Sequence, residues 1–196
     1  MKLYLFLKHI DKIDSIEPIE GVDMEVIKLT SNITSSELPW DIFINLVEKS
    51  YKLKHEEVLF CTDLTFFNPT LIKNVESGIE LAKKLNANLI LFNAKYVNKM
   101  LPVSNYYFWV DCYAKSQIFL LNESFLPKIL ANKNEGGSSV DHFLSKITSN
   151  KILYSPMLAP TTDCEFSVLS KRMRLISSKF TELKANQHFY NTIAIK

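Results

Sequence analysis

The sequence predicts an α/β protein in which helices cover both faces of a central sheet, a sandwich of three layers. Short apolar runs typical of buried strands alternate along the chain with longer segments whose apolar residues recur every three or four positions, as in amphipathic helices. The length of 196 residues fits one domain over residues 1–196, with enough material for a sizeable core.

The most informative stretch is the apolar run Val58–Cys61, which turns polar at Thr62 and Asp63. It predicts a buried strand with a polar tip. A helix should follow, because Asn68 suits an N-cap and Pro69 suits the first helical position, where a missing N–H costs nothing. Ligands of open α/β sheets bind beyond the carboxyl ends of such strands. Asp63 could therefore hold a divalent metal or a ribose hydroxyl, or it could simply end the strand.

The elements on either side follow from the same patterns. A first strand is expected over residues 2–7 and a second over 24–29. A helix beginning around residues 35–39 places Trp40, Phe43, Ile44 and Val47 on one inward face. Further along, we expect a helix over 69–85, a strand over 89–92 and an irregular aromatic-rich loop over 95–109. A strand over 116–121 and a helix to about 131, capped by Asn122 or Ser124, should follow, and then a flexible segment over 133–139. The last expected elements are a helix over 140–148, a strand over 151–154, a loop over 156–163 and a basic helix from about 166.

Composition excludes several classes of protein. The net charge of +2 gives no reason to expect a nucleic-acid partner, and no apolar run approaches the length of a membrane span. The chain has only four glycines and no glycine-rich phosphate loop, which excludes a P-loop or dinucleotide-binding fingerprint. Its three cysteines are widely spaced without a metal or disulfide pattern, which suits a reducing cytoplasm. The apolar start of the chain is interpreted as a strand rather than a signal peptide.

Three pieces of the chain resemble a known family in their order and spacing. They are EEVLFCTDLTFFNP, SQIFLLNESFLPKIL and SSVDHFLSKITSNKILYSPMLAPTTDCEFSVLS, which together fall within about residues 36–170. In this order they resemble glycosyltransferase family 25, the lipopolysaccharide-type sugar transferases. The resemblance implies a GT-A-like (Rossmann-like) α/β/α sandwich with a mixed central sheet.

The resemblance also implies an activity. Such enzymes move a sugar from a nucleotide-sugar donor to a hydroxyl of a saccharide or glycoconjugate, so the implied acceptor is a glycan or a lipid-linked saccharide. The cysteine pattern predicts a cytoplasmic location, and the basic cluster at Arg172 and Arg174 leaves association with the inner face of the membrane as a further option. The alternative is a catalytically degenerate relative that binds a saccharide or a protein partner.

The acidic motif is where the sequence departs from the family. Relatives usually carry Glu-Asp-Asp at the strand tip, where Mn²⁺ or Mg²⁺ offsets the charge of the leaving diphosphate. The matching residues here are Thr62, Asp63 and Leu64, and a D-x-D reading places the hydroxyl of Thr65 where the second acid belongs. Asp63 is the remaining metal ligand, and Thr62, Asp63 and Thr65 are the candidates at this strand tip for binding the donor nucleotide. The protein therefore binds metal weakly, works without metal, or no longer catalyses.

Asp141 is the candidate catalytic residue. It matches an acid near the start of a later helix that faces the site in relatives, and there it would act as general base toward the acceptor hydroxyl. An Asp in the first helical turn, after Ser138 or Ser139 as N-cap, is equally well explained by its interaction with the helix dipole.

The remaining candidates would contact the substrates. Gln117 matches a polar residue of the second piece and could touch the donor sugar, although a Gln that starts a strand is ordinary. Arg172 and Arg174, the only arginines, could bind the donor pyrophosphate, or they could lie on a solvated helix face. Trp109 and Asp111 are candidates for acceptor binding, with the indole stacked on a sugar ring, although aromatic clusters more often belong to a core.

Overall fold

The computed structural model describes residues 1–7, 21–29, 38–62, 69–94, 96–104, 107–137 and 139–154, together with residues 171, 172, 175 and 178. Its strands are β1 (Lys2–Leu7), β2 (Asp23–Lys28), β3 (Glu57–Cys61), β4 (Leu89–Leu91), β5 (Tyr96–Val97), β6 (Met100–Pro102), β7 (Tyr107–Val110), β8 (Tyr113–Ala114), β9 (Ile118–Asn122) and β10 (Lys151–Tyr154). Its helices are α1 (Trp40–Lys52), α2 (Pro69–Leu85), α3 (Leu126–Ala131) and α4 (Val140–Ile147), with 3₁₀ turns η3 (Glu123–Phe125) and η4 (Lys133–Glu135).

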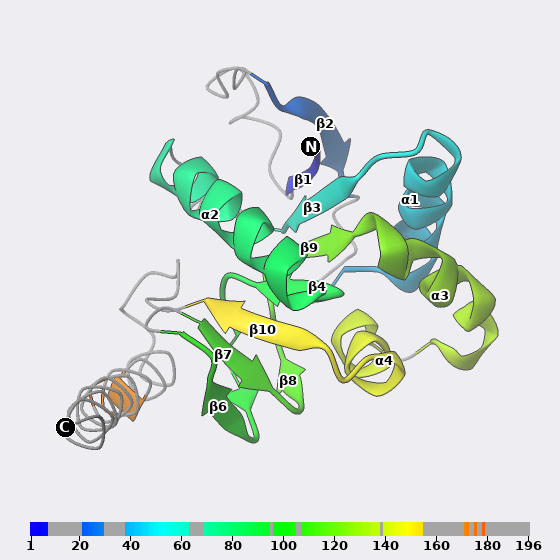
Figure 1. The fold of residues 1–196 in the computed structure, drawn as a ribbon. Helices are drawn as coiled ribbons and strands as arrows, with labels where there is room; N and C mark the ends of the chain where they lie inside the picture. The colour runs from blue at the N-terminus through cyan, green and yellow to red at the C-terminus, as the bar shows by residue number, and fades with distance from the viewer. Residues whose placement is uncertain are drawn as a thin grey trace, which may run out of the picture.

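Eight of these strands form one mixed sheet, in the order β2-β1-β3-β9-β4-β10-β7-β6 (Figure 1). Strands β2, β1 and β3 run parallel, as do β4 and β10, while β9 lies antiparallel between β3 and β4. The carboxyl ends of β3 and β4 and the start of β9 therefore meet at one edge of the sheet, which we call the carboxyl edge.

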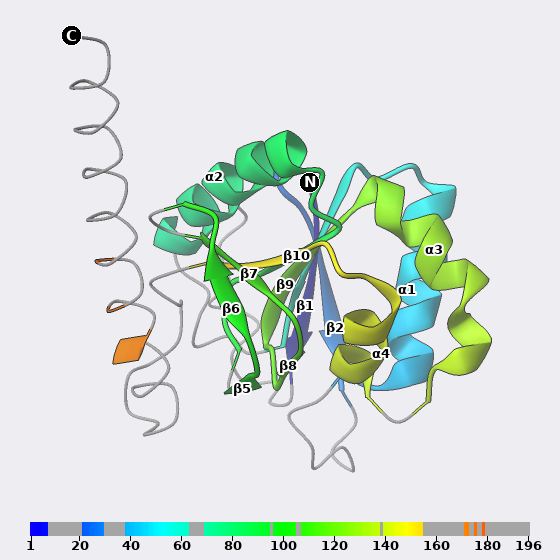
Figure 2. The ribbon, with the colours of Figure 1, turned by 60° about the horizontal axis from the view of Figure 1, so that its bottom comes forward.

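Helices cover both faces of this sheet. Figure 2 shows α2 on one face and α1, α3 and α4 on the other. The buried apolar side chains divide accordingly into two clusters, one of which includes Phe43, Phe60 and Phe143 and the other Leu59, Val75 and Phe92. Alternate residues of a strand point to opposite faces, so neighbouring residues of β3 supply both clusters. The predicted α/β class, with helices on both faces of a mixed sheet, is confirmed.

Strand β3 is an inner strand of the sheet and, apart from Glu57, is apolar on both faces. All five of its residues are buried, as expected for a strand covered by helices on each side. Phe60 stacks on Phe119 of β9 with ring centroids 5.0 Å apart. Phe43 of α1 packs against the Phe60 ring at a centroid distance of 5.5 Å. The inward helix face predicted over α1 is confirmed for Phe43, Ile44 and Val47, which are all buried.

The segment 95–109 differs from the expectation of an irregular loop. It contains β5, β6 and the start of β7, and β7 pairs antiparallel with both β10 and β6. The sequence YFWV of β7 consists of aromatic and β-branched residues that favour strands. Strands of two to four residues are too short to show a period, which is why the pattern missed them.

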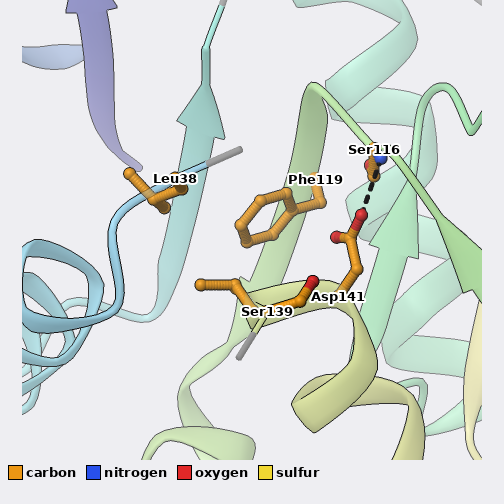
Figure 3. A pocket seen from close by; sticks show the side chains of 6 residues that line it. Leu38, Ser116, Phe119, Ser139 and Asp141 are labelled. Carbon is orange, nitrogen blue, oxygen red and sulfur yellow. Dashed lines mark hydrogen bonds between the residues drawn. The ribbon is translucent and has the colours of Figure 1, made fainter. Parts of the chain in front are cut away.

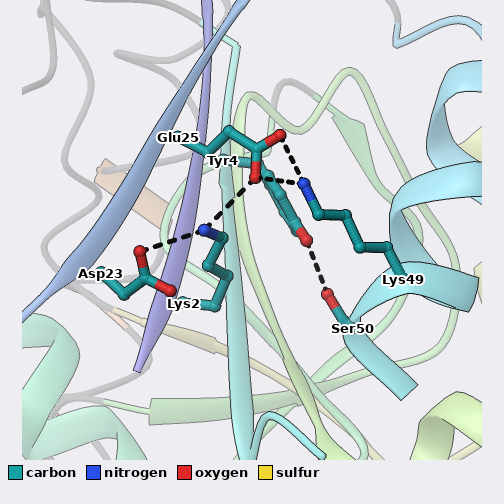
Figure 4. A network of polar contacts seen from close by, with 6 residues as sticks. All are labelled: Lys2, Tyr4, Asp23, Glu25, Lys49 and Ser50. Carbon is teal, nitrogen blue, oxygen red and sulfur yellow. Dashed lines mark hydrogen bonds and ion pairs between the residues drawn. The ribbon is translucent and has the colours of Figure 1, made fainter. Parts of the chain in front are cut away.

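A network of charged side chains ties the β2 end of the sheet to α1 (Figure 4). The Lys2 ammonium lies 3.1 Å from Asp23 Oδ1 and 3.3 Å from Glu25 Oε2, and Lys49 Nζ donates to both oxygens of Glu25 at 2.8 Å. Glu25 therefore joins β1, β2 and α1. The network explains how Lys2 can be almost completely buried, since burying a charge without a partner is costly.

Helix α4 is anchored at both ends. Near its start, Gly136 lies against the indole of Trp40, which also packs edge-on against Phe143 with ring centroids 4.7 Å apart. At its end, the buried ammonium of Lys151 donates to the carbonyl oxygens of Ser145 at 3.0 Å and Thr148 at 2.5 Å. These carbonyls belong to the last turn of α4 and the residue after it, where no intrahelical donor is available.

Other expectations have mixed outcomes. Asn122 caps η3, because its Oδ1 accepts from the backbone N–H of Ser124 at 3.3 Å. The loop expected over 156–163 and the N-cap expected at Asn68 lie outside the described residues. Of the basic segment expected from about 166, residues 171, 172, 175 and 178 are described, and each has helical backbone. None of the described helices combines the length and hydrophobicity that a membrane span requires.

Candidate functional site

Polar residues from three elements meet at the carboxyl edge. Thr62 directly follows β3, Asn93 follows the buried run of β4, and Gln117 directly precedes β9. The Thr62 backbone N–H donates to the Gln117 carbonyl at 2.8 Å, and the Asn93 side-chain amide donates to Gln117 Oε1 at 3.3 Å. Two of the residues predicted to contact the donor, Thr62 and Gln117, therefore lie side by side.

Asn93 organises this edge, and sequence reasoning missed it. Its side chain is fully buried, and its Oδ1 accepts from the backbone N–H groups of Gln117 at 2.8 Å and Ile118 at 3.0 Å. Its backbone carbonyl accepts from Ser116 Oγ at 2.9 Å. The Asn93 side chain thus accepts hydrogen bonds from backbone N–H groups that lie just beyond the end of the β4–β9 ladder. The available signal was a polar residue immediately after a buried apolar run.

Asp141 reaches the same edge from the first turn of α4. Its Oδ2 accepts from the backbone N–H of Ser116 at 2.9 Å, and the residue is only 7% exposed (Figure 3). Ser139 occupies the N-cap position without making a side-chain cap hydrogen bond. The carboxylate therefore anchors the chain just before β9 in addition to lying in a helical first turn.

A pocket opens beside this carboxylate. Leu38, Phe119 and Val140 contribute apolar wall, and Ser116, Ser139 and Asp141 contribute polar atoms (Figure 3). Its enclosed volume is about 10 Å³, roughly the room that one water molecule needs. Pockets that enclose whole ligands hold roughly 300–1,000 Å³. This pocket is therefore too small for a sugar or a nucleotide, and a ligand at this edge would have to bind outside it.

A buried tyrosine lies near Asp141 in the interior. Tyr113 of β8 is almost completely buried, and within the described part of the chain its hydroxyl makes no hydrogen bond. Burial raises the pKa of the Tyr113 hydroxyl well above its usual value, and the nearby charge of Asp141 raises it further. Electrostatic interactions of Asp141 are therefore weakly screened on this side.

Trp109 and Asp111 lie apart from these residues. Strand β7 runs antiparallel to β10, so its carboxyl end points to the opposite edge of the sheet. There the Trp109 indole N–H donates to the Ser149 carbonyl at 2.6 Å, and the Asp111 backbone N–H donates to the Lys99 carbonyl at 3.2 Å. The structure does not bring these two acceptor candidates together with Thr62, Gln117 and Asp141.

Three other candidates cannot be placed at the edge. Asp63, Thr65 and Arg174 lie outside the described residues. Arg172 is described and exposed, with helical backbone.

The described residues do not fit a divalent metal. Among them, no group of three or more His, Cys, Asp or Glu side chains is placed to hold a metal ion. Thr62, Asn93 and Gln117 offer neutral oxygens, whereas Mg²⁺ and Mn²⁺ sites use carboxylates. Binding of Mn²⁺ or Mg²⁺ therefore stays a prediction that rests on Asp63.

Fold and site together define a mixed α/β protein with a polar site at the carboxyl edge of its sheet. No protein-family model matches the chain, and no curated protein matches it.

Proposed function

We propose that the protein is a glycosyltransferase that binds a nucleotide sugar at the carboxyl edge and moves the sugar to a hydroxyl of a saccharide or glycoconjugate. The proposal combines the family resemblance of the sequence with the mixed α/β sheet. In such sheets, ligands bind beyond the carboxyl ends of the strands. A GT-A-like arrangement is the finer form of this fold that the proposal requires.

One observation carries the proposal. Thr62 is hydrogen-bonded to Gln117, and the neighbouring Ser116 is hydrogen-bonded to Asp141. Three candidates chosen from separate parts of the sequence are thereby connected at one edge of one sheet.

In the proposed reaction Asp141 acts as general base. The acceptor hydroxyl gives its proton to the Asp141 carboxylate, and its oxygen forms a bond to the anomeric carbon of the donor sugar. The bond between that carbon and the diphosphate oxygen breaks, which releases a nucleoside diphosphate. The hydrogen bond from the Ser116 N–H holds the carboxylate in one orientation, as a base that must meet a hydroxyl requires.

The test combines donor binding with two variants of Asp141. The purified chain is titrated by calorimetry with UDP-glucose, UDP-galactose, UDP-N-acetylglucosamine and GDP-mannose, with and without Mn²⁺, and release of nucleoside diphosphate is followed. Asp141→Asn keeps an oxygen that can accept from Ser116 but removes the base. We expect it to bind donor normally and to lose about 10²–10⁴-fold in turnover. Asp141→Ala should also lose stability, because the Ser116 N–H is left unpaired.

A second candidate function is favoured by a specific observation. The Asp141 carboxylate is buried and bonded to the main chain, as it would be in a relative that binds a saccharide or a protein partner without catalysis. If Asp141→Asn turns over substrate as fast as the wild type, Asp141 is not the general base. The transferase proposal fails if none of the four donors binds under either condition.

A further inference from the structure

Lys115 has a backbone conformation that local structure does not explain. Its φ of +56° lies in the left-handed region, as do those of Lys54 at +55° and Asn86 at +51°. Lys54 and Asn86 come just after α1 and α2, where left-handed residues commonly end helices. Lys115 instead lies between β8 and β9, with no helix before it. Such outliers concentrate at binding sites, where the surrounding structure holds them in place.

The residues on both sides of Lys115 hold it in this conformation. Before it, Ala114 pairs with Tyr96 in the two-stranded β5–β8 sheet, and β8 packs next to α4 (Figure 2). After it, the Ser116 N–H donates to Asp141 at 2.9 Å, and the Ser116 hydroxyl donates to the Asn93 carbonyl at 2.9 Å. Hydrogen bonds on both sides therefore fix the backbone of Lys115, while its side chain remains exposed.

The Lys115 ammonium lies over an aromatic ring of the two-stranded β5–β8 sheet. Its Nζ lies 5.5 Å from the centroid of the Tyr96 ring, within cation–π range. Tyr96 itself is 45% exposed. Lys115 forms no ion pair with any residue that the structure describes, and neither does the exposed Lys54, whereas five other lysines pair with carboxylates, namely Lys2, Lys49, Lys83, Lys133 and Lys146. The charge of Lys115 is thus available to a ligand.

We propose that Lys115 binds a phosphate oxygen of the ligand, namely the diphosphate of a nucleotide. The inference rests on the proposed function, because it places the diphosphate of the donor at the carboxyl edge. At this edge the side chains of Thr62, Asn93 and Gln117 are neutral and Asp141 is a carboxylate bonded to Ser116, so none of them offsets the charge of a diphosphate. Lysine provides a compact charge on a flexible stem, which suits a phosphate group. Tyr96 keeps this charge oriented until the ligand arrives.

Lys54 is a matched control for every variant of Lys115. It is also an exposed lysine with left-handed backbone, but it lies before β3, at the opposite edge of the sheet. Glycine adopts this backbone without strain, so Lys115→Gly and Lys54→Gly should both raise the melting temperature. Only Lys115→Gly should also weaken the binding of a phosphate ligand. A purely structural role for Lys115 predicts the gain in stability without the loss of affinity.

The experiment is calorimetric titration with inorganic pyrophosphate, UDP, GDP and CDP, and with the four nucleotide sugars. Lys115→Gln should bind the best of these ligands about tenfold more weakly than the wild type, because a charged hydrogen bond is lost. Lys54→Gln should bind like the wild type. Melting temperatures of both variants verify that they are folded.

The possible results separate the two proposals. If a nucleotide sugar binds and Lys115→Gln binds it equally well, the role of Lys115 is wrong and the transferase proposal stands. If only pyrophosphate or a nucleoside diphosphate binds, and Lys115→Gln weakens that binding, the phosphate site stands and the transferase proposal fails. If the wild type binds none of these ligands, both are overturned.

Discussion

At the scale of single residues, sequence reasoning found side chains but not the interactions that connect them. Thr62, Gln117 and Asp141 were selected one by one, and the structure places them at one edge. Asn93 was missed because its importance depends on β9 lying beside β4, which no local pattern encodes. Asp63, the acid on which the metal depends, lies outside the described residues and stays a prediction.

Gly136 offers a test of how the start of α4 is positioned. A Cβ at this position would lie far inside van der Waals contact of the Trp40 ring, and Trp40 in turn packs against Phe143. We expect Gly136→Ala to lower the free energy of unfolding by about 1–3 kcal/mol, measured by urea denaturation, because the indole must move.

The control for Gly136→Ala is Asn134→Ala in the same segment. Asn134 is exposed, so its substitution should change the unfolding free energy by no more than about 0.5 kcal/mol. Equal stability of Gly136→Ala and the wild type would mean that the indole of Trp40 does not lie against the Gly136 backbone.

At the scale of elements, helices and long strands were predicted well and short strands were not. The helix expected over 69–85 corresponds to α2 (Pro69–Leu85), because a 17-residue element repeats its apolar period several times. Strands β5 and β8 have only two residues each and exist because they pair with each other across the sequence. Their residues show no pattern that would distinguish them from a loop.

Helix α4 provides the test at this scale, because a buried lysine caps its end. Lys151→Met fills a similar volume but leaves the carbonyls of Ser145 and Thr148 without their donor. We expect a loss of roughly 1–3 kcal/mol in the free energy of unfolding, as for unpaired buried polar groups. Burial lowers the pKa of the Lys151 ammonium, which shows that its charge is partly desolvated. Removing that desolvated charge offsets part of the loss.

The matched control is Lys146→Met on the same helix. Lys146 forms an exposed ion pair with Glu135 at 2.9 Å, and such pairs contribute about 0–1 kcal/mol. A smaller effect for Lys151→Met than for Lys146→Met would show that the capping contacts do not stabilise α4.

At the scale of the whole molecule, alternating strands and helices predicted the layers but could not order the strands. Strand β9 lies between β3 and β4, which brings residues 57–61, 89–91 and 118–122 together. This strand order depends on packing between residues that are far apart in the sequence. The stacking of Phe60 on Phe119 is one such contact. The charged network at the β2 end of the sheet is likewise a product of assembly, since it joins three elements.

That network should make the stability of the molecule depend on pH in a defined direction. Hydrogen bonding to Lys49, and then to Lys2, holds the pKa of Glu25 below its usual value of 4.5, although desolvation works in the opposite sense. Because the folded-state pKa is depressed, Glu25 contributes stability at pH values above about 4.5, and this contribution is lost as the pH falls through the folded-state pKa. The Glu25 side chain is about one-third exposed, so solvent screening limits the contribution to below about 1 kcal/mol.

The measurement compares the wild type with Glu25→Gln by urea denaturation between pH 7 and pH 3. Above about pH 5 the variant should be less stable by a constant amount, because its amide cannot pair with Lys2 and Lys49 as a charge. Below that range the two curves should converge as Glu25 of the wild type becomes protonated, while every other titrating group is common to both proteins. A difference that stays constant down to pH 3 would show that the charge of Glu25 does not hold β2 to α1. Any stability lost at neutral pH would then come from the shape of the side chain alone.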